Sequence, residues 1–288
     1  MPELPEVECV RKSVEPLLLG KHVQRVDIAR PDICECFSGP INNLKSTKPT
    51  PARLLQGCDI THLIRLGKQI GILTKQGPSL CVHLGMSGQL ADAATIAERA
   101  KLNAIQGKHV HITWHLSDGN AVSFRDPRRF GGIWSYESES ALREHRFASL
   151  GPDGLKIIGP QLQQAASHSQ RAVKAALLDQ SIVAGVGNIY ADEALFVAKV
   201  SPLRKCTKLR SEEWNTIAHA IHQVLKQSIA AGGSTLRDYV NAKGERGRNQ
   251  ETHAVYGRSN KPCLMCNAPL HRATIAQRTT VWCTNCQH

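Results

Sequence analysis

The sequence contains no run of 18 or more apolar residues, no internal repeat and no low-complexity segment. A transmembrane helix needs about 20 consecutive, mostly apolar residues, so the first absence argues against a helical membrane protein. The amino terminus also lacks the basic and then apolar layout of a secretory signal. We therefore expect a soluble protein of the cytoplasm.

The composition fits a globular protein with a highly charged partner. A chain of 288 residues with 41% hydrophobic residues is long enough for two domains. In a reducing compartment, its ten cysteines favour metal ligands and free thiols over disulfides. The net charge of +12 favours a polyanion, and residues 201–288 carry 13 basic against 5 acidic side chains. The basic surface is therefore expected mostly in the last third of the chain.

The first half of the chain is rich in short β-type runs separated by turn residues. These runs cover residues 23–29, 59–66, 69–74, 79–84, 109–116, 121–125 and 132–136. Their length and spacing predict an antiparallel sandwich or barrel. Residues 39–51 are expected to form a loop, and residues 91–108 a loop or a short exposed helix.

The second half changes to helical periodicity, which places a domain boundary near residue 137. Helices are predicted at residues 142–150, 161–167, 171–178, 189–196 and 211–231. Ser211 is the expected N-cap of the last of these helices, because two glutamates follow it. Gly232 and Gly233 are expected to end that helix.

The amino-terminal segment begins Met1-Pro2-Glu3-Leu4-Pro5-Glu6 and permits two interpretations. Apolar residues at helical spacing from Leu4 to Leu18 predict a helix, and both Pro and Glu are common in a first helical turn. Alternatively, removal of Met1 leaves a proline amine beside two carboxylates. An α-amino group has a reference pKa of roughly 8, so a sizeable neutral fraction is available as a nucleophile near pH 7.

Four cysteines near the carboxyl terminus have the spacing of a zinc site. Cys263 and Cys266 form one CxxC pair, Cys283 and Cys286 form the other, and sixteen residues separate the pairs. Four thiolates complete a tetrahedral shell, so the zinc would be structural. A β-hairpin over residues 272–281 would carry Arg278 near its tip, either as a phosphate ligand or as a solvated side chain.

Several segments, taken in order, resemble the formamidopyrimidine-DNA glycosylase family, bacterial enzymes that excise oxidised purines. The resemblance extends over essentially the whole chain. The matching segments are PELPEVE at 2–8, RLGK at 65–68, HLGMSG at 83–88, DPRRFG at 126–131, GVGNIYADEALF at 185–196, GGSTLRDYVN at 232–241, VYGR at 255–258 and AQRTT at 276–280 within the four-cysteine finger.

The resemblance implies an α+β protein of two domains that binds double-stranded DNA in the cleft between them, as a monomer. Residues 1–137 would form an N-terminal antiparallel β-sandwich with an N-terminal helix. Residues 138–254 would form a helix-two-turns-helix domain that includes a lesion-recognition loop, and residues 255–288 the zinc-finger hairpin. One structural Zn²⁺ is the expected cofactor.

The resemblance also assigns catalytic roles. Pro2 would attack C1′ of the damaged nucleotide and hold the sugar as an iminium ion, which permits β- and δ-elimination of the phosphates. Glu3 would transfer protons at the sugar ring, and Glu6 would orient the opened sugar and a bound water. Lys68 would place a cation by the scissile phosphate, and Arg278 would bind phosphate from the finger.

Further residues match DNA contacts of the family. Asn188, at a helix amino terminus, would bind phosphate, and Tyr256 and His109 would contact the backbone. Met86, Arg128 and Phe130 resemble the three side chains that fill the gap left by an everted nucleotide. Such filling is needed because the reacting sugar carbon is inaccessible inside the duplex.

Two other functions are weighed against this one. The endonuclease VIII branch prefers oxidised pyrimidines, but its members usually begin Pro-Glu-Gly-Pro-Glu, whereas this chain has Leu4, and they generally lack a GGSTLRDYVN segment. A zinc-finger DNA-binding protein without catalysis would have no reason to keep Pro2, Glu3, Glu6 and Lys68.

The polar loop 242–253 departs from the family pattern because it lacks an expected aromatic residue.

Overall fold

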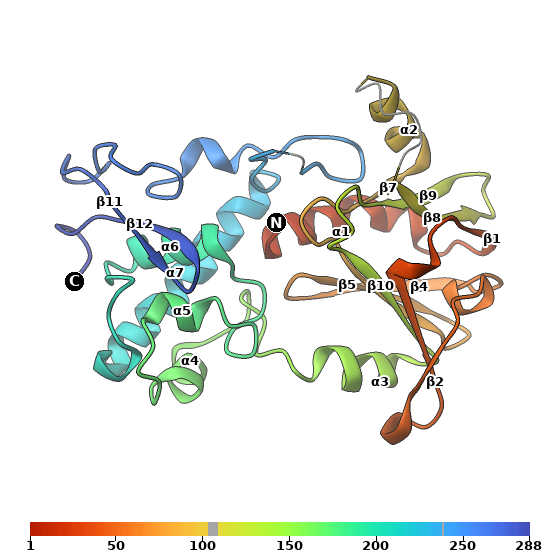
Figure 1. Cartoon of the computed structure of the whole chain (residues 1–288), viewed down its shortest axis with the longest axis horizontal. Coiled ribbons are helices and arrows are strands. Elements are labelled where there is room, and N and C mark those ends of the chain that lie inside the picture. The colour runs from red at the N-terminus through yellow and green to blue at the C-terminus, as the bar shows by residue number, and fades with distance from the viewer. Residues whose placement is uncertain (103–108, 238) are drawn as a thin grey trace. The chain divides into compact units, whose positions relative to one another are not determined.

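The structure is a computed structural model that describes residues 1–102, 109–237 and 239–288 (Figure 1). The chain divides into two compact units. Unit 1 comprises Met1–Ser149 and Gly232–Gly247, and unit 2 comprises Leu150–Ala231 and Arg248–His288. The domain limits expected from the sequence stay a prediction. No helix within the described ranges is both long and apolar enough to cross a bilayer.

Unit 1 is built on two β-sheets. One has the strand order β1-β8-β9-β7 and the other β3-β2-β10-β6-β5-β4. The strands are β1 (Val23–Ile28), β2 (Cys34–Ser38), β3 (Lys45–Thr47), β4 (Ile60–Leu66), β5 (Gln69–Thr74), β6 (Ser79–His83), β7 (Gln89–Asp92), β8 (Val110–Leu116), β9 (Ala121–Arg125) and β10 (Gly132–Tyr136). All seven predicted strands are present, whereas β2, β3 and β7 were not predicted. The pairing is antiparallel except between β2 and β10.

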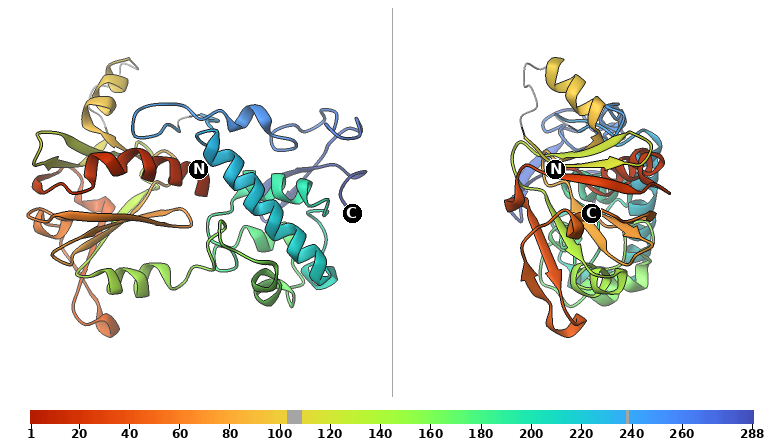
Figure 2. Two further views of the ribbon diagram at one scale, coloured as in Figure 1. Left: turned by 180° about the vertical axis from the view of Figure 1, so that it is seen from behind. Right: turned by 90° about the vertical axis from the view of Figure 1, so that its right-hand side faces the viewer.

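The first helix, α1 (Leu4–Leu18), packs against the strands of unit 1 (Figure 2). Leu4, Val7, Val10 and Val14 recur at helical spacing, and each is at most 1% exposed. Most of this apolar face joins the main core together with residues of both sheets. The helix predicted from periodicity is thus confirmed, and its packing fixes the start of the chain on unit 1.

Two further helical segments belong to unit 1. Helix α2 (Ala93–Leu102) follows β7, so residues 91–102 include a helix as expected, and residues 103–108 of that prediction lie outside the described part. Helix α3 (Glu139–Leu142) continues into a wider helical turn over Arg143–Phe147. Short 3₁₀ turns lie at Pro31–Ile33, Ile41–Asn43 and Ala52–Leu54 in unit 1, and at Cys206–Lys208 and Asn249–Thr252 in unit 2.

Unit 2 contains the helices α4 (Gly159–Ala166), α5 (Val173–Leu177), α6 (Asn188–Val197) and α7 (Ser211–Ala230). Helix α7 packs against α4 and α6. Ser211 is its first helical residue and not its N-cap, so that prediction is wrong: Arg210 precedes the helix, and Oε2 of Glu213 accepts its backbone N–H at 2.9 Å. Gly232 and Gly233 follow the helix with φ of +78° and +86°, as expected of glycines that end a helix.

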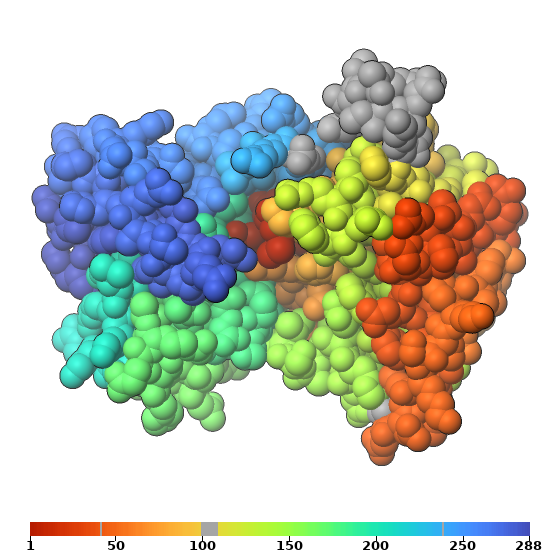
Figure 3. Space-filling model, viewed as in Figure 1, coloured from red at the N-terminus to blue at the C-terminus, as the bar shows by residue number. Residues whose placement is uncertain are grey.

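The carboxyl-terminal hairpin consists of β11 (His271–Ile275) and β12 (Arg278–Trp282). Ala276 and Gln277 form its two-residue turn with φ of +48° and +58°, so Arg278 lies next to the tip as predicted. Strand β12 packs against α6, and Phe196 of that helix shares a small core with the finger. In space-filling view the blue carboxyl-terminal segment forms a broad part of the surface of unit 2 (Figure 3).

Candidate functional site

The residues directly after Met1 lie at the start of α1 and are buried within unit 1. Pro2 is buried, whereas Met1 is 55% exposed. Glu3 precedes the helix, and its backbone N–H donates to Oε2 of Glu6 at 2.8 Å. The exposed fractions of Glu3 and Glu6 are 4% and 1%. The helical and the catalytic interpretations of this segment are therefore compatible, because Glu3 follows Pro2 directly and Glu6 lies in the first turn of the helix.

Glu6 also contacts a segment far along the chain. Its Oε1 accepts the backbone N–H of Ser234 at 2.7 Å, and its backbone carbonyl accepts the hydroxyl of Tyr239 at 3.2 Å. Both oxygens of the carboxylate thus accept backbone N–H groups, one from Glu3 and one from Ser234. Ser234 lies in the matched segment GGSTLRDYVN but received no role from the sequence, because a backbone donor leaves no mark on residue type. These hydrogen bonds hold the Glu6 carboxylate in place within unit 1.

Lys68 occupies the second position of the two-residue turn between β4 and β5. Gly67 takes the first position with φ +55°, a conformation that favours glycine. Lys68 is 8% exposed. The turn between two paired strands therefore fixes the backbone of this lysine, in agreement with its predicted place after a strand.

Three of the predicted DNA-contacting side chains gather on two loops of unit 1. Met86 lies between β6 and β7 and is 42% exposed, and Phe130 lies between β9 and β10 and is 57% exposed. The guanidinium of Arg128 lies 5.3 Å from the centre of the Phe130 ring, a cation–π distance. His109 is exposed just before β8, with φ +74°. Exposed apolar side chains beside an arginine suit contact with bases.

In unit 2, α6 and the hairpin bring two other predicted contacts together. Asn188 is the first residue of α6, and its Nδ2 donates to the carbonyl of Thr279 at 3.0 Å. Arg278 is the neighbour of Thr279 and is exposed. The Asn188 side chain therefore binds the hairpin directly, while the start of α6 lies beside the strand that carries Arg278.

Tyr256 is held by the same helix through a residue that the sequence did not single out. Oε1 of Glu193 accepts the backbone N–H groups of Tyr256 at 2.8 Å and Val255 at 2.9 Å, and Oε2 accepts that of Ala254 at 2.8 Å. Glu193 is 7% exposed. The sequence signal that could have identified Glu193 was its position in the matched segment GVGNIYADEALF.

A fully buried ion pair connects α5, α6 and the hairpin. Nζ of Lys174 lies 2.6 Å from Oδ1 of Asp192, and both side chains are 0% exposed. Lys174 also donates to the hydroxyl of Thr280 at 2.8 Å, and Oδ2 of Asp192 accepts the backbone N–H of Val281 at 3.2 Å. Burial raises the pKa of Asp192 to about 7, against the opposing charge of Lys174. Neither residue was a sequence candidate.

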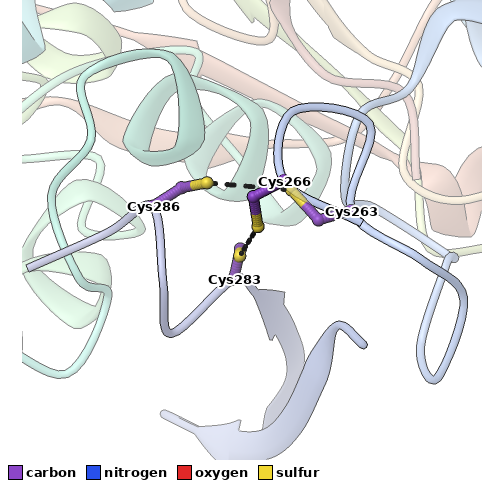
Figure 4. Close-up of side chains that lie close together, drawn as sticks. All are labelled: Cys263, Cys266, Cys283 and Cys286. Carbon is purple, nitrogen blue, oxygen red and sulfur yellow. Dashed lines mark hydrogen bonds between the residues drawn. The ribbon is translucent and has the colours of Figure 1, made fainter. Parts of the chain in front are cut away.

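The four cysteines of the two CxxC pairs face one another (Figure 4). Their sulfur atoms all lie within 4.8 Å of each other, with 3.9 Å between Cys263 and Cys286 and 3.4 Å between Cys266 and Cys283. Zn–S bonds of about 2.3 Å in a tetrahedron place sulfur atoms roughly 3.8 Å apart. The donor set and its spacing therefore fit a structural Zn²⁺, as the sequence predicted.

Comparison with known proteins decides the family. The family model described as the formamidopyrimidine-DNA glycosylase N-terminal domain matches residues 1–133, and that described as its H2TH domain matches residues 150–240. The formamidopyrimidine-DNA glycosylase of Xanthomonas campestris pv. campestris (strain 8004) is 38% identical over 291 residues, which cover all of both chains. The chain belongs to the formamidopyrimidine-DNA glycosylase family.

Solved structures of the formamidopyrimidine-DNA glycosylase family share its fold. The MutM (Fpg) protein of Thermus thermophilus is 35% identical with a TM-score of 0.82, covering 99% of this chain and 98% of that one. A mutant Lactococcus lactis Fpg in complex with Fapy-dG-containing DNA is 27% identical with a TM-score of 0.83, covering all of both chains. The predicted family and two-domain α+β fold are confirmed, whereas the roles of the individual site residues stay predictions.

Proposed function

We propose that this chain is a base excision repair enzyme, a DNA glycosylase and AP lyase that removes oxidised purines from duplex DNA. The observation that carries the proposal is the buried segment Pro2–Glu6 at the start of α1, in which Pro2 directly precedes Glu3 and the Glu6 carboxylate accepts the backbone N–H of Glu3. The DNA complex of the Lactococcus lactis relative, which contains an oxidised purine, favours the purine branch over endonuclease VIII.

Pro2 is the proposed nucleophile. After removal of Met1, its nitrogen forms a bond to C1′, the glycosidic bond breaks, and the bonding electrons leave with the base, which takes up a proton. The nitrogen loses its own proton, O4′ leaves C1′ as a hydroxyl, and C1′ is held as an iminium ion. This cation withdraws electrons, so loss of a C2′ proton expels the 3′ phosphate, and a second elimination expels the 5′ phosphate.

The charged neighbours supply proton transfer and phosphate binding. Glu3 donates the proton to O4′ and later accepts protons during elimination, as a general acid and base. Glu6 holds the backbone of Glu3 in place through its hydrogen bond of 2.8 Å. Lys68 and Arg278 bind the phosphates that flank the damaged nucleotide, because cations stabilise the charge that develops on the departing oxygen atoms.

Double-stranded DNA that contains an oxidised base or an abasic site is the proposed partner, bound by a monomer in the cytoplasm on the nucleoid. Asn188, Tyr256 and His109 contact its backbone. Met86, Arg128 and Phe130 enter the duplex and occupy the place of the everted nucleotide. The net charge of +12 supports such a partner, since a basic protein gains affinity for DNA through counterion release. The zinc held by the four cysteines orders the hairpin and takes no part in the reaction.

Borohydride trapping tests the proposal. The mature protein is incubated with a duplex that contains 8-oxoguanine or, separately, an oxidised pyrimidine, and borohydride reduces the iminium to a stable protein–DNA bond. We expect a covalent complex on the 8-oxoguanine duplex, with a Pro2→Gly variant as the matched control that keeps an amine but loses its secondary character. Absence of trapping on both duplexes contradicts the catalytic assignment, and trapping on the pyrimidine alone contradicts the purine assignment.

A further inference from the structure

The side chain of Asp126 accepts hydrogen bonds from both loops that carry the exposed DNA-contacting residues of unit 1. Its Oδ1 accepts the hydroxyl of Ser87 at 2.6 Å and the backbone N–H of Arg128 at 3.3 Å, and its Oδ2 accepts the backbone N–H of Gly131 at 2.7 Å. The residue is 0% exposed. A buried carboxylate is costly unless donors surround it, and the donors Ser87, Arg128 and Gly131 all belong to these two loops.

The main chain of Asp126 extends the same contacts to a third segment. Its N–H donates to the carbonyl of His109 at 3.0 Å, and its carbonyl oxygen lies 2.8 Å from Nε2 of the buried His111. His109 has φ +74°, a conformation that is unfavourable for a residue other than glycine and that surrounding contacts must hold. Asp126 is thus one residue through which three DNA-contacting segments are joined.

The two loops also pack backbone against backbone, which leaves them little freedom. A Cβ added to Gly85, whose φ is +60°, would lie 2.3 Å from the backbone N of Gly131 and from the carbonyl carbon of Phe130. A Cβ added to Gly131 would lie 2.6 Å from the carbonyl oxygen of His83. Met86 and Phe130 therefore project from a base whose backbone is locked, although their own side chains are exposed.

We propose that Asp126, together with Ser87, is a positioning residue that holds Met86, Arg128 and Phe130 as one preformed wedge for entry into the duplex. The inference rests on the proposed function. Eversion requires unstacking, and a wedge that had to become ordered during binding would lose part of its binding energy to that ordering. Asp126 itself faces the protein and does not touch DNA.

The test uses the full-length protein and its Asp126→Asn variant. An asparagine presents an amide NH₂ toward one or more of the three donors, so at least one of the hydrogen bonds that hold the two loops is lost or weakened. Two substrates are compared: a duplex with 8-oxoguanine and a neighbouring 2-aminopurine that reports insertion, and a single strand with an abasic site that needs no wedge. We expect insertion and excision on the duplex to slow about tenfold or more, and cleavage of the single strand to change less than about threefold.

Three further variants make the result specific. Ser87→Ala removes one donor, leaves the Gly131 bond and should show a smaller defect of the same kind, which also covers the case that Asp126→Asn fails to fold. Asp118→Asn is the matched control, because this exposed aspartate also accepts a backbone N–H, that of Asn120 at 3.1 Å. In a Met86→Ala background, Asp126→Asn should slow insertion and excision on the duplex by a smaller factor than in the wild type, since part of the wedge is already absent.

The outcomes separate the two hypotheses. Equal losses on duplex and single strand, or an unchanged insertion signal, overturn the positioning role, as does full additivity with Met86→Ala. If the wild-type protein excises neither 8-oxoguanine nor an oxidised pyrimidine, the proposed function fails instead, whatever the variants do. A duplex-specific defect in both Asp126→Asn and Ser87→Ala supports the inference.

Discussion

Nε of Arg65 donates to Oε2 of Glu8 at 2.9 Å, and the same guanidinium donates through Nη1 to the carbonyl of Gly67 at 3.0 Å. This relationship connects α1, which starts directly after Glu3, with the turn that carries Lys68. Burial raises the pKa of Glu8, but the hydrogen bonds and charges of Arg11 and Arg65 outweigh burial and hold that pKa below its usual value. Arg65 thereby fixes one proposed catalytic segment relative to the other.

The lowered pKa of Glu8 predicts a dependence of stability on pH. A carboxylate with a lower pKa in the folded state stabilises the protein above its unfolded pKa of about 4.3, and this contribution is lost as the pH falls through the folded value. The difference in unfolding free energy between wild type and Glu8→Gln should be about 1–3 kcal/mol at pH 7 and shrink toward zero in acid. Urea unfolding at a series of pH values measures it.

Glu15→Gln provides the control for this experiment, because Glu15 also pairs with Arg11 but is one third exposed. Its effect should stay below about 1 kcal/mol at all pH values. If the difference in unfolding free energy between wild type and Glu8→Gln does not change between pH 7 and pH 3, the lowered pKa of Glu8 is contradicted.

Glu6→Gln should impair excision through position and not through charge. The amide must turn its NH₂ group toward the backbone N–H of either Glu3 or Ser234, which leaves a buried donor without an acceptor. We expect a loss of about 1–3 kcal/mol in stability and a roughly ten- to hundredfold slower excision of 8-oxoguanine. Single-turnover kinetics at saturating enzyme measure the second effect. Unchanged excision in a destabilised variant would show that the contact serves only folding.

The sequence predicted the segments of the fold that have strong local patterns. The β-type runs between turn residues at β4, β5, β8 and β9, and the helical period of α1, were sufficient, because each is a continuous run of residues with one local preference. Strand β2 was missed since Cys34–Ser38 contains few typical strand formers, and β3 and β7 are only three and four residues long. Their strand structure depends on pairing with neighbours, which local sequence does not record.

In the candidate site, too, some residues could be predicted from the sequence and others could not. The CxxC spacing and the motif matches gave residues whose side-chain chemistry is distinctive, such as the four cysteines, Pro2 and Arg278. The residues that hold them were missed or received no role: Ser234 acts through its backbone N–H, and Glu193 and Asp126 accept several backbone N–H groups. These contacts depend on loop geometry, so residue identity alone could not indicate them.

Lys174→Met should destabilise unit 2, because it leaves Asp192 buried without its counter-charge. Removal of one partner of a buried pair costs about 3–5 kcal/mol. The double variant Lys174→Met/Asp192→Asn should recover part of this loss, since a neutral amide oxygen can still accept the N–H of Val281. Denaturant unfolding compares the single and double variants. Equal stabilities would mean that the charge of Asp192 carries no cost in the absence of the lysine.

Loss of zinc should remove the proposed phosphate contact of Arg278 and leave the proposed amino-terminal chemistry in place. Cys266→Ser opens the four-sulfur shell, so the bound zinc should fall from one per chain toward none, whereas Cys206→Ser, at a buried cysteine outside that shell, should leave it at one. Without an ordered hairpin, affinity for an abasic duplex should fall at least about tenfold. The slope of log affinity against log salt should decrease by about one phosphate contact, as in Arg278→Ala.

Metal analysis and binding titrations at several salt concentrations measure both effects. A zinc-free variant that keeps the wild-type salt slope would contradict the hairpin's role, because Arg278 would then reach phosphate without the fold that the four sulfur atoms hold together.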